Sequence, residues 1–203
     1  MLKSYGEKLP TVELNNTFYR MPKRVVLETW ASRVPDDFRF SIKASRRITH
    51  IRRLKDAQSE IGFLFQNLEV LGEKLGVVLA QLPPTMKVDV ERLKLFLEML
   101  PGEAPVSFEF RHPSWHCEEV YDVLQAHQAG VVTTDAKSDT PEPMRATSSI
   151  GYFRLRKPEY PDQELDDIAA SIKAQPWAKC FVFFKHEEEA IGPLLAMKFQ
   201  ERF

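Results

Sequence analysis

The stretch Val106-Ser107-Phe108-Glu109-Phe110-Arg111-His112 alternates apolar and polar side chains from one residue to the next. Successive side chains of a β-strand point to opposite faces, so this stretch predicts a strand with one apolar and one polar face. Six further runs are predicted as strands. The seven are Thr11–Tyr19, Phe38–Ser45, Leu75–Leu82, Val106–His112, Ala129–Asp135, Ile150–Lys157 and Lys179–His186.

Helical patterns fill most of the intervals between these strands. They cover Lys23–Arg33, Asp56–Lys74, Asp89–Leu100, Glu118–His127, Asp162–Ala174 and Glu187–Phe203. Gly192-Pro193 is a candidate break or kink in the last of them. The long connection Ala136–Ser149 is typical either of a functional lid or of a disordered loop. Alternating strands and helices predict βα units around a parallel sheet.

One face of most predicted strands is polar, which is unusual for a parallel sheet because both of its faces are normally buried and apolar. The polar positions are Glu13, Asn15, Thr17, Ser41, Lys43, Gln81, Ser107, Glu109, Arg111, Thr133, Asp135, Arg154 and Arg156. A barrel with helices outside and a polar interior explains this pattern better than a flat sheet. The predicted fold class is therefore α/β, a TIM-type (β/α) barrel.

The length of 203 residues is enough for one sizeable core, so residues 1–203 are predicted to form a single domain. Barrels of this type usually have eight strands and about 250 residues. The chain offers seven strands and starts with what resembles the end of a helix. We therefore expect the domain to be N-terminally short and to lack the first βα unit.

Composition narrows the class of protein. The formal net charge of −1 provides no overall field toward nucleic acid or membranes. Cys117 and Cys180 fit no CxxC spacing, and reduced thiols indicate a cytoplasmic protein. No apolar run approaches the roughly 18 residues that a membrane span requires, so no membrane association is predicted. The sequence leaves the oligomeric state open.

Five ordered motifs resemble the DUF72 family, also called YecE-like. They are Val12-Glu13-Leu14-Asn15-Asn16-Thr17-Phe18-Tyr19-Arg20, Phe38-Arg39-Phe40-Ser41-Ile42-Lys43-Ala44, Ile48-Thr49-His50, Gln81-Leu82-Pro83-Pro84 and Phe110-Arg111-His112-Pro113-Ser114-Trp115. The resemblance covers nearly the whole chain and implies a TIM-type barrel of unestablished activity. Family members usually begin with a Gly- and Trp-containing strand followed by a helix, and this sequence lacks that segment.

The polar lining is the main candidate site, because ligands of TIM barrels sit at the C-terminal ends of the strands. The candidate catalytic residues are Glu13, Glu109 and Asp135, and the candidate ligand-binding residues are Asn15, Lys43, Gln81, Arg111, His112 and Arg154. Cations beside carboxylates could hold a phosphate- or carboxylate-bearing ligand while a carboxylate moves a proton. A buried ion-pair network that only fills the barrel is the alternative.

A basic segment follows the second predicted strand. Arg46, Arg47, Arg52 and Arg53 could track the phosphates of a nucleotide or nucleic acid, or could simply be solvated.

Other hypotheses use the same residues differently. A divalent-metal phosphoesterase or nuclease could use Glu13, Glu109, Asp135 and His186, although nearby cations would compete with a metal. A carbohydrate-directed site would pair Glu13 with Glu109. A non-catalytic binding module would use strand edges left unpaired by the missing first strand. We assign no metal and no cofactor from the sequence, and we leave catalysis and binding both open.

Overall fold

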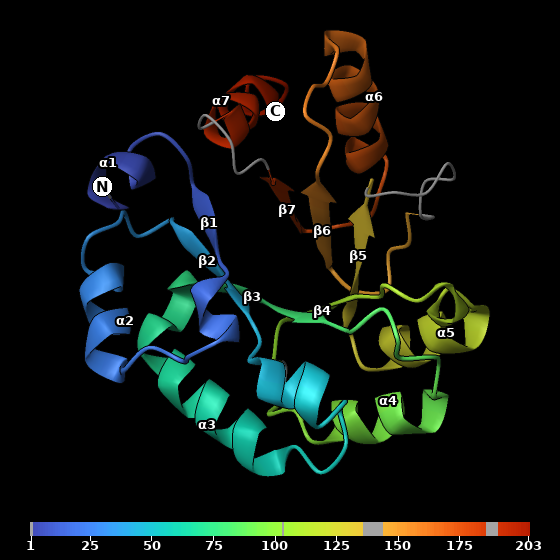
Figure 1. The fold of residues 1–203 in the computed structure, drawn as a ribbon. Coiled ribbons are helices and arrows are strands. Elements are labelled where there is room, and N and C mark those ends of the chain that lie inside the picture. The colour runs from blue at the N-terminus through green and yellow to red at the C-terminus, as the bar shows by residue number, and fades with distance from the viewer. Residues whose placement is uncertain (1, 103, 136–143, 186–190) are drawn as a thin grey trace.

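The structure is a computed structural model that describes residues 2–102, 104–135, 144–185 and 191–203. Within these ranges, seven parallel strands form one sheet in which each strand pairs with the next along the chain. The strands are β1 (Thr11–Leu14), β2 (Arg39–Lys43), β3 (Leu75–Gln81), β4 (Val106–Glu109), β5 (Gly130–Thr134), β6 (Ile150–Leu155) and β7 (Lys179–Phe184). The seven predicted strands are confirmed, and Figure 1 shows them curving around a common centre.

The first strand is shorter than predicted, because the chain turns away from the sheet after Leu14. Asn16–Phe18 forms a 3-10 turn instead of continuing β1. Within this turn, the Thr17 hydroxyl lies 2.8 Å from the carbonyl oxygen of Leu14 and 2.7 Å from that of Lys43. The turn therefore fastens the end of β1 to the end of β2.

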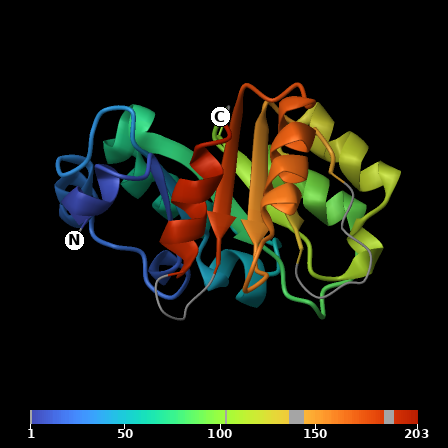
Figure 2. The same cartoon turned by 90° about the horizontal axis from the view of Figure 1, so that it is seen from above.

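Helices cover the outside of the sheet, and Figure 2 shows α6 and α7 lying outside β6 and β7. The helices are α1 (Leu2–Gly6), α2 (Arg24–Ala31), α3 (Gln58–Leu68), α4 (Val90–Glu98), α5 (Glu118–Ala126), α6 (Asp162–Lys173) and α7 (Ile191–Gln200). The predicted helix Asp56–Lys74 changes after Leu68 into a 3-10 segment, where Gly72 adopts a left-handed φ of 48°. Gly192-Pro193 lies in the first turn of α7, where proline is tolerated, and does not break that helix.

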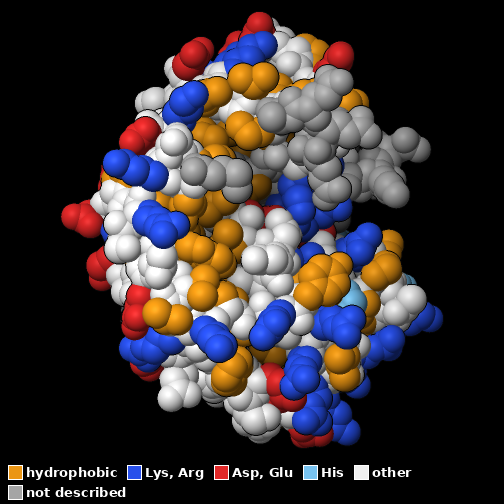
Figure 3. Space-filling model, turned by 60° about the vertical axis from the view of Figure 1, so that its left-hand side comes forward, with side chains coloured by type: hydrophobic (Ala, Val, Ile, Leu, Met, Phe, Trp, Pro, Cys, Tyr) orange, Lys and Arg blue, Asp and Glu red, His pale blue; other side chains and the backbone are white. Residues whose placement is uncertain are grey.

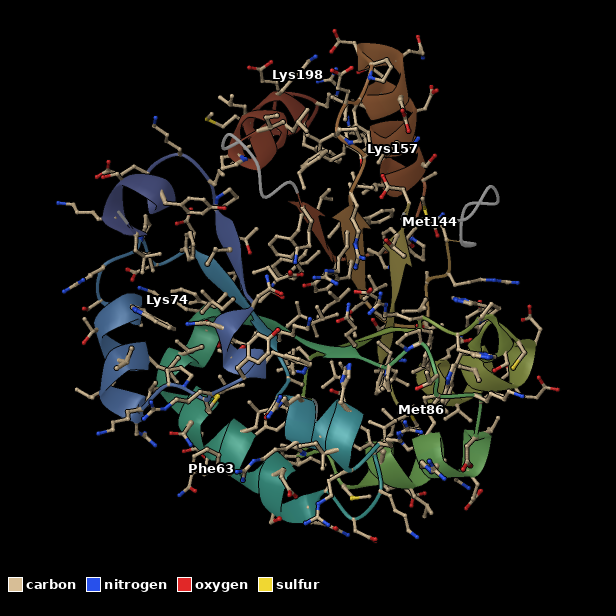
Figure 4. All side chains as sticks on the ribbon, viewed as in Figure 1. Phe63, Lys74, Met86, Met144, Lys157 and Lys198 are labelled. Carbon is tan, nitrogen blue, oxygen red and sulfur yellow. The ribbon has the colours of Figure 1, made fainter. Side chains whose placement is uncertain are left out.

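The main core lies between the outer face of the sheet and the helices. Phe40 and Ile42 of β2 and Phe108 of β4 are fully buried there, and the Ile61, Leu64 and Leu68 stripe of α3 belongs to the same cluster. Complete burial of one such side chain is worth about 1.5–3 kcal/mol. The predicted apolar outer face is confirmed for these strands. In Figure 4, the exposed Phe63 of α3 points away from this core.

The barrel interior has two layers instead of the single polar lining that the sequence predicted. Its lower layer is apolar and contains Val77, Leu79, Val132, Tyr152, Phe181 and Phe183. The upper layer, at the C-terminal ends of the strands, holds the charges. The charged side chains of the described interior are therefore confined to the end of the barrel at which TIM-type proteins place their sites, while small hydroxyl groups such as Ser41 and Ser107 are buried deeper.

Strand β5 corrects one prediction about this interior. Val132 packs in the interior cluster with residues of β3, β6 and β7. Because side chains alternate along a strand, Thr133 and Asp135 cannot share the face of Val132. The prediction that these two residues lie on the polar interior face is wrong.

The barrel is nearly closed. Its two edge strands, β1 and β7, approach each other at a few positions. In the described residues, no ladder of hydrogen bonds joins these two strands. A groove of about 650 Å³ lies along them, lined by apolar side chains that include Leu9, Val182, Phe184 and Phe199. We refer to this groove as the seam. Figure 3 shows hydrophobic side chains running as a band across this side of the molecule.

Across the ranges that the structure describes, no helix has the length and apolar character needed to span a bilayer.

Candidate functional site

Arg154 of β6 is the centre of the upper interior layer. Its side chain is only 1% exposed, and its Nε and Nη2 each donate to the Glu13 carboxylate at 2.9 Å. Its Nη1 donates to Oε2 of Glu109, and Arg156 Nη2 donates to the other oxygen of Glu109 at 2.7 Å. One buried guanidinium therefore joins carboxylates from β1 and β4. Charges this deeply buried are tolerated only when they are paired.

Both carboxylates stay ionised in this arrangement. Burial raises the pKa of Glu13, but the charge of Arg154 and its hydrogen bonds, with Lys185 and Tyr152, outweigh burial and hold the pKa at about 2. Burial opposes ionisation of Glu109 as well, and the charges of Arg154 and Arg156 lower its pKa below the ordinary value. Carboxylates held in this way are weak bases and are not proton donors near neutral pH.

Two neutral groups and a second cation complete the contacts of Glu13. Tyr152 donates its hydroxyl to Oε2 at 2.6 Å and lies 2.7 Å from the hydroxyl of Ser41. Asn15 donates its amide to Oε1 at 2.9 Å. Lys185, which follows β7, places its Nζ 3.5 Å from the same oxygen. Together these contacts fix the carboxylate in one position.

A pocket of about 290 Å³ opens above this layer, at the mouth of the barrel. Its lining consists of five cations and one amide: Lys43, Gln81, Arg111, Arg154, Arg156 and Lys185. These residues come from β2, β3 and β6 or follow directly after β4, β6 and β7. We refer to this pocket as the cationic mouth. Four of the six, Lys43, Gln81, Arg111 and Arg154, are predicted ligand-binding residues that the structure brings together.

Gln81 links the amine of Lys43 to the buried network. Its Nε2 donates to Glu109 Oε1 at 2.8 Å, and its Oε1 accepts from Lys43 Nζ at 2.7 Å. The amine also lies 4.5 Å from the centre of the Phe18 ring. Burial and the neighbouring charges of Arg154 and Lys185 lower the pKa of Lys43 to about 8.

Glu13, Glu109 and Asn15 lie in the network behind the cationic mouth, and the two remaining predicted site residues, Asp135 and His112, belong to neither. Asp135 accepts from the backbone N–H of Arg156 at 2.6 Å and from the Tyr160 hydroxyl. His112 Nδ1 lies 2.8 Å from the Ser114 hydroxyl and accepts the backbone N–H of the same serine, so it caps a short 3-10 turn. Both side chains have local structural partners, and neither lines the pocket.

The arginine-rich segment lies beside the mouth. It follows β2 as a π-helical turn at Arg47–Ile51, and the side chains of Arg46, Arg47, Arg52 and Arg53 are exposed. Arg52 pairs with Glu60 at 3.1 Å. His50 of this turn stacks edge-on against Phe18, 4.9 Å away between ring centres, and Phe18 in turn meets the largely exposed Tyr19.

The metal and carbohydrate hypotheses fit this geometry poorly. In residues 2–102, 104–135, 144–185 and 191–203, no group of three or more His, Cys, Asp or Glu residues could hold a metal ion. His186, a ligand of the proposed metal set, lies outside the described residues, as does most of the predicted lid. A glycosidase needs a carboxyl group that donates a proton, and Glu13 and Glu109 are both locked to arginines.

Sequence reasoning missed three residues of the site. Lys185 stands two positions after Phe183, which points inward, so strand alternation could have placed it at the mouth. Arg156 follows Arg154 in the same way, and it lay in the predicted lining without being assigned a role. Tyr152 has no such signal, because a tyrosine in a strand is usually a core residue.

The family described as "Protein of unknown function DUF72" matches residues 1–203. UPF0759 protein YecE of Escherichia coli (strain K12) is 32% identical over 134 residues, which cover 64% of this chain and 49% of the relative. The chain therefore matches about half the length of that relative.

Solved structures share the fold. A DUF72 family protein from Enterococcus faecalis V583 superposes with a TM-score of 0.86 at 21% identity, covering 99% of this chain and 92% of that one. A chain described as a xylose isomerase-like TIM barrel/4-hydroxyphenylpyruvate dioxygenase fusion protein gives a TM-score of 0.59 at 14% identity, covering 97% and 38%. These likenesses confirm the TIM-type barrel.

Proposed function

Because this chain belongs to the DUF72 family, whose name carries no activity, its function has to be inferred from its site, and we propose that it binds a small anionic ligand at the cationic mouth. The ligand carries a phosphate or carboxylate group. Lys43, Arg111 and Arg156 contact the anion, with Lys185 and the outer edge of Arg154 behind them. One observation carries this proposal: among the residues that the structure describes, every charged side chain that lines the pocket is a cation.

The charge balance of the pocket supports an anionic ligand. In the described part of the chain, five cations line it, while the network behind it supplies the two carboxylates of Glu13 and Glu109. Both carboxylates are turned toward Arg154, Arg156 and Lys185 and do not line the pocket as free acceptors. A surplus of positive charge in a partly dry concavity attracts an anion and repels a metal cation. The volume of about 290 Å³ fits a small molecule.

Four of the five cations are held in place before any ligand arrives, and the exposed Arg111 is the exception among the described residues. Arg154 is fixed by three hydrogen bonds to carboxylate oxygens of Glu13 and Glu109, and Gln81 fixes the amine of Lys43. For these four side chains, binding therefore has little conformational entropy to lose, since they are already ordered. In this proposal Glu13 and Glu109 are supports for the cations, although the sequence suggested them as catalytic groups. Their lowered pKa values suit that supporting role better than proton transfer.

Thermal unfolding with inorganic phosphate tests the proposal. A ligand that binds the native state raises the melting temperature by mass action. We expect phosphate to raise the melting temperature of the wild type, and glycerol at equal concentration to leave it unchanged. Lys43→Met and Arg111→Met each remove one cation from the mouth and should lose most of the phosphate shift.

Matched controls remove the same charges from exposed positions. Lys94→Met on α4 and Arg33→Met after α2 should keep the full phosphate shift. Higher ionic strength should reduce the shift in the wild type, because the attraction is electrostatic. If the shift is the same in the wild type, Lys43→Met and Arg111→Met, the assignment of the mouth is wrong.

The arginine-rich segment favours a second candidate, a nucleotide or nucleic-acid ligand. Four exposed arginines lie beside Phe18, Tyr19 and His50, so basic and stacking groups adjoin each other. Such a ligand would place a phosphate in the cationic mouth and a base against Tyr19. Binding of a labelled single-stranded oligonucleotide at several salt concentrations tests this. The candidate fails if Arg46→Met with Arg47→Met leaves both the affinity and its salt dependence unchanged.

A further inference from the structure

Lys43 differs from three of the other cations of the mouth, and from the other lysine among them, in what it contacts. Arg154, Arg156 and Lys185 each have a carboxylate within ion-pair distance. Within the described residues, Lys43 has no carboxylate partner; its Nζ contacts the neutral amide oxygen of Gln81 and the face of Phe18. Its charge is therefore not tied to an opposite charge.

Gln81 suits both protonation states of the Lys43 amine. Its Nε2 is held by Glu109, which turns its Oε1 toward Lys43 Nζ. An ammonium group can donate one N–H to that oxygen, and so can a neutral amine. The neutral form keeps one N–H on Gln81, which leaves a lone pair that can point into the pocket.

The surroundings of Lys43 favour the neutral amine. Burial disfavours the charged form first, and the positive charges of Arg154 and Lys185 add to this, while Glu109 and Glu13 oppose it. The resulting pKa is about 8. Arg111 and Arg156 also line the pocket, and His50 on the turn beside it has a pKa that Lys43, among other cations, lowers. Near neutral pH, part of the protein therefore carries a nucleophilic amine among cations.

We propose that Lys43 forms an imine with the aldehyde or keto carbonyl of a small ligand that also bears a carboxylate or phosphate group. The inference deepens the proposed function and rests on it, since the anionic group is held by the other cations. The Lys43 nitrogen attacks the carbonyl carbon and forms a C–N bond. The carbonyl oxygen leaves as water with both amine hydrogens, and no oxidant or reductant is needed.

Among the described residues, Lys185 is the other lysine that lines the mouth, and it is the poorer candidate. Burial and the charges of Arg154 and Arg156 lower the pKa of Lys185 as well, but its Nζ lies 3.5 Å from Glu13 Oε1, a carboxylate contact that opposes this lowering and that Lys43 lacks within the described ranges. The arginines cannot act, because a guanidinium does not give up its proton in proteins. Lys43 is therefore the amine with access to the pocket and no ionic partner in the described chain.

Reductive trapping tests this assignment with glyoxylate, a small aldehyde that carries a carboxylate. The protein is treated with glyoxylate and cyanoborohydride at pH 7.5, and the modified lysines are identified by peptide mass spectrometry. A pKa near 8 gives on the order of 100-fold more neutral amine than an ordinary lysine, and a less basic amine is a weaker nucleophile. We expect Lys43 to react at least about tenfold faster than the exposed Lys94 of the same molecule.

Four comparisons separate this inference from simple lysine reactivity. Propionaldehyde, which has no charge, should label Lys43 more slowly than glyoxylate does. Inorganic phosphate should slow labelling of Lys43 and leave Lys94 unaffected. Lys185→Met removes a positive neighbour, which raises the pKa of Lys43, so labelling at pH 7.5 should slow. In Lys43→Arg, the fast label should disappear.

The outcomes distinguish the imine from the proposed function. If Lys43 reacts no faster than Lys94 while phosphate still stabilises the protein, the imine is wrong and the anion site stands. If Lys43 reacts fast with both aldehydes equally and phosphate has no effect, the anionic class of ligand is wrong. If neither labelling nor stabilisation occurs, both proposals fall.

Discussion

The cationic mouth and the seam between β1 and β7 are stabilised in opposite ways: the mouth by buried, paired charges and the seam by apolar contacts. At the mouth, Arg154 and the two carboxylates it joins are almost fully buried, and every one of them is paired. Along the seam, two strand edges meet without a ladder in the described residues, and apolar side chains line a groove of about 650 Å³. Because Arg154 joins β1 to β4 and β6 by ion pairs while no ladder joins β1 to β7 in the described residues, the charge network fixes the geometry of the site more than closure of the sheet does.

The largest effect should come from removing the central guanidinium. Arg154→Met leaves the carboxylates of Glu13 and Glu109 buried without their main partner. We expect the free energy of unfolding to fall by about 3–5 kcal/mol, measured by urea denaturation. Adding Glu13→Gln to Arg154→Met should recover part of the loss, because one uncompensated charge is removed.

Arg156→Met is the matched control for that substitution. Its side chain is about a quarter exposed and pairs only with Glu109, so we expect a loss of about 1 kcal/mol. Equal losses of unfolding free energy for Arg154→Met and Arg156→Met would contradict the central role of Arg154 in the network.

Acid should reduce the stability that the charge network behind the mouth provides, whereas the apolar packing along the seam does not depend on the ionisation of Glu13. The pKa of Glu13 is about 2 in the folded protein and about 4.3 in an unfolded chain. A carboxylate with a lowered folded pKa stabilises the native state above its unfolded pKa, and that stability is lost as the pH falls through the folded pKa. Glu13 should therefore contribute about 3 kcal/mol at pH 7 that disappears between roughly pH 5 and pH 2.

Urea midpoints measured across this pH range test the assignment. Glu13→Gln should flatten the dependence on pH, whereas Glu98→Gln on the exposed face of α4 should leave its slope unchanged. A wild-type slope that persists in Glu13→Gln would assign the acid sensitivity to other groups.

The smallest expected difference is between the stability costs of removing apolar atoms from the closed core and from the seam. Val77 lies fully buried in the lower interior layer, while Val182 is partly buried and lines the seam. Val77→Ala should cost about 2 kcal/mol, because a closed core cannot collapse around the lost atoms. Val182→Ala should cost less than about 1 kcal/mol, since the groove already leaves space beside it. Denaturant unfolding of the two variants gives both values, and equal costs would mean that the seam packs as tightly as the core.

The sequence predicted the strands well because their alternation is local and strong. Phe108 and Glu109 on adjacent positions already indicate opposite faces, and Lys43, Glu109 and Arg154 met as expected. The failures came from contacts distant in sequence. Tyr152 bonds to Glu13 across 139 residues, and nothing near either residue signals it. Asp135 was assigned to the interior by its parity with Thr133, and the packing of Val132 decides that parity.

The roles of Glu13 and Glu109 could not be read from the sequence for a related reason. A carboxylate on a barrel strand is a base when free and a support when an arginine holds it. The distinction depends on where the Arg154 guanidinium lies, and strand periodicity gives only its face. The interior position of Lys185 could have been predicted from the same periodicity, since it continues the series of inward-pointing residues Phe181 and Phe183.

The most direct test of the account is the position of an anion in a crystal of this protein soaked with tungstate, located by its anomalous signal. The account predicts a tungstate within hydrogen-bond distance of Lys43, Arg111 and Arg156, with Glu13 and Glu109 still bonded to Arg154. Tungstate bound only along Arg46–Arg53, or an empty mouth at saturating tungstate, would contradict it.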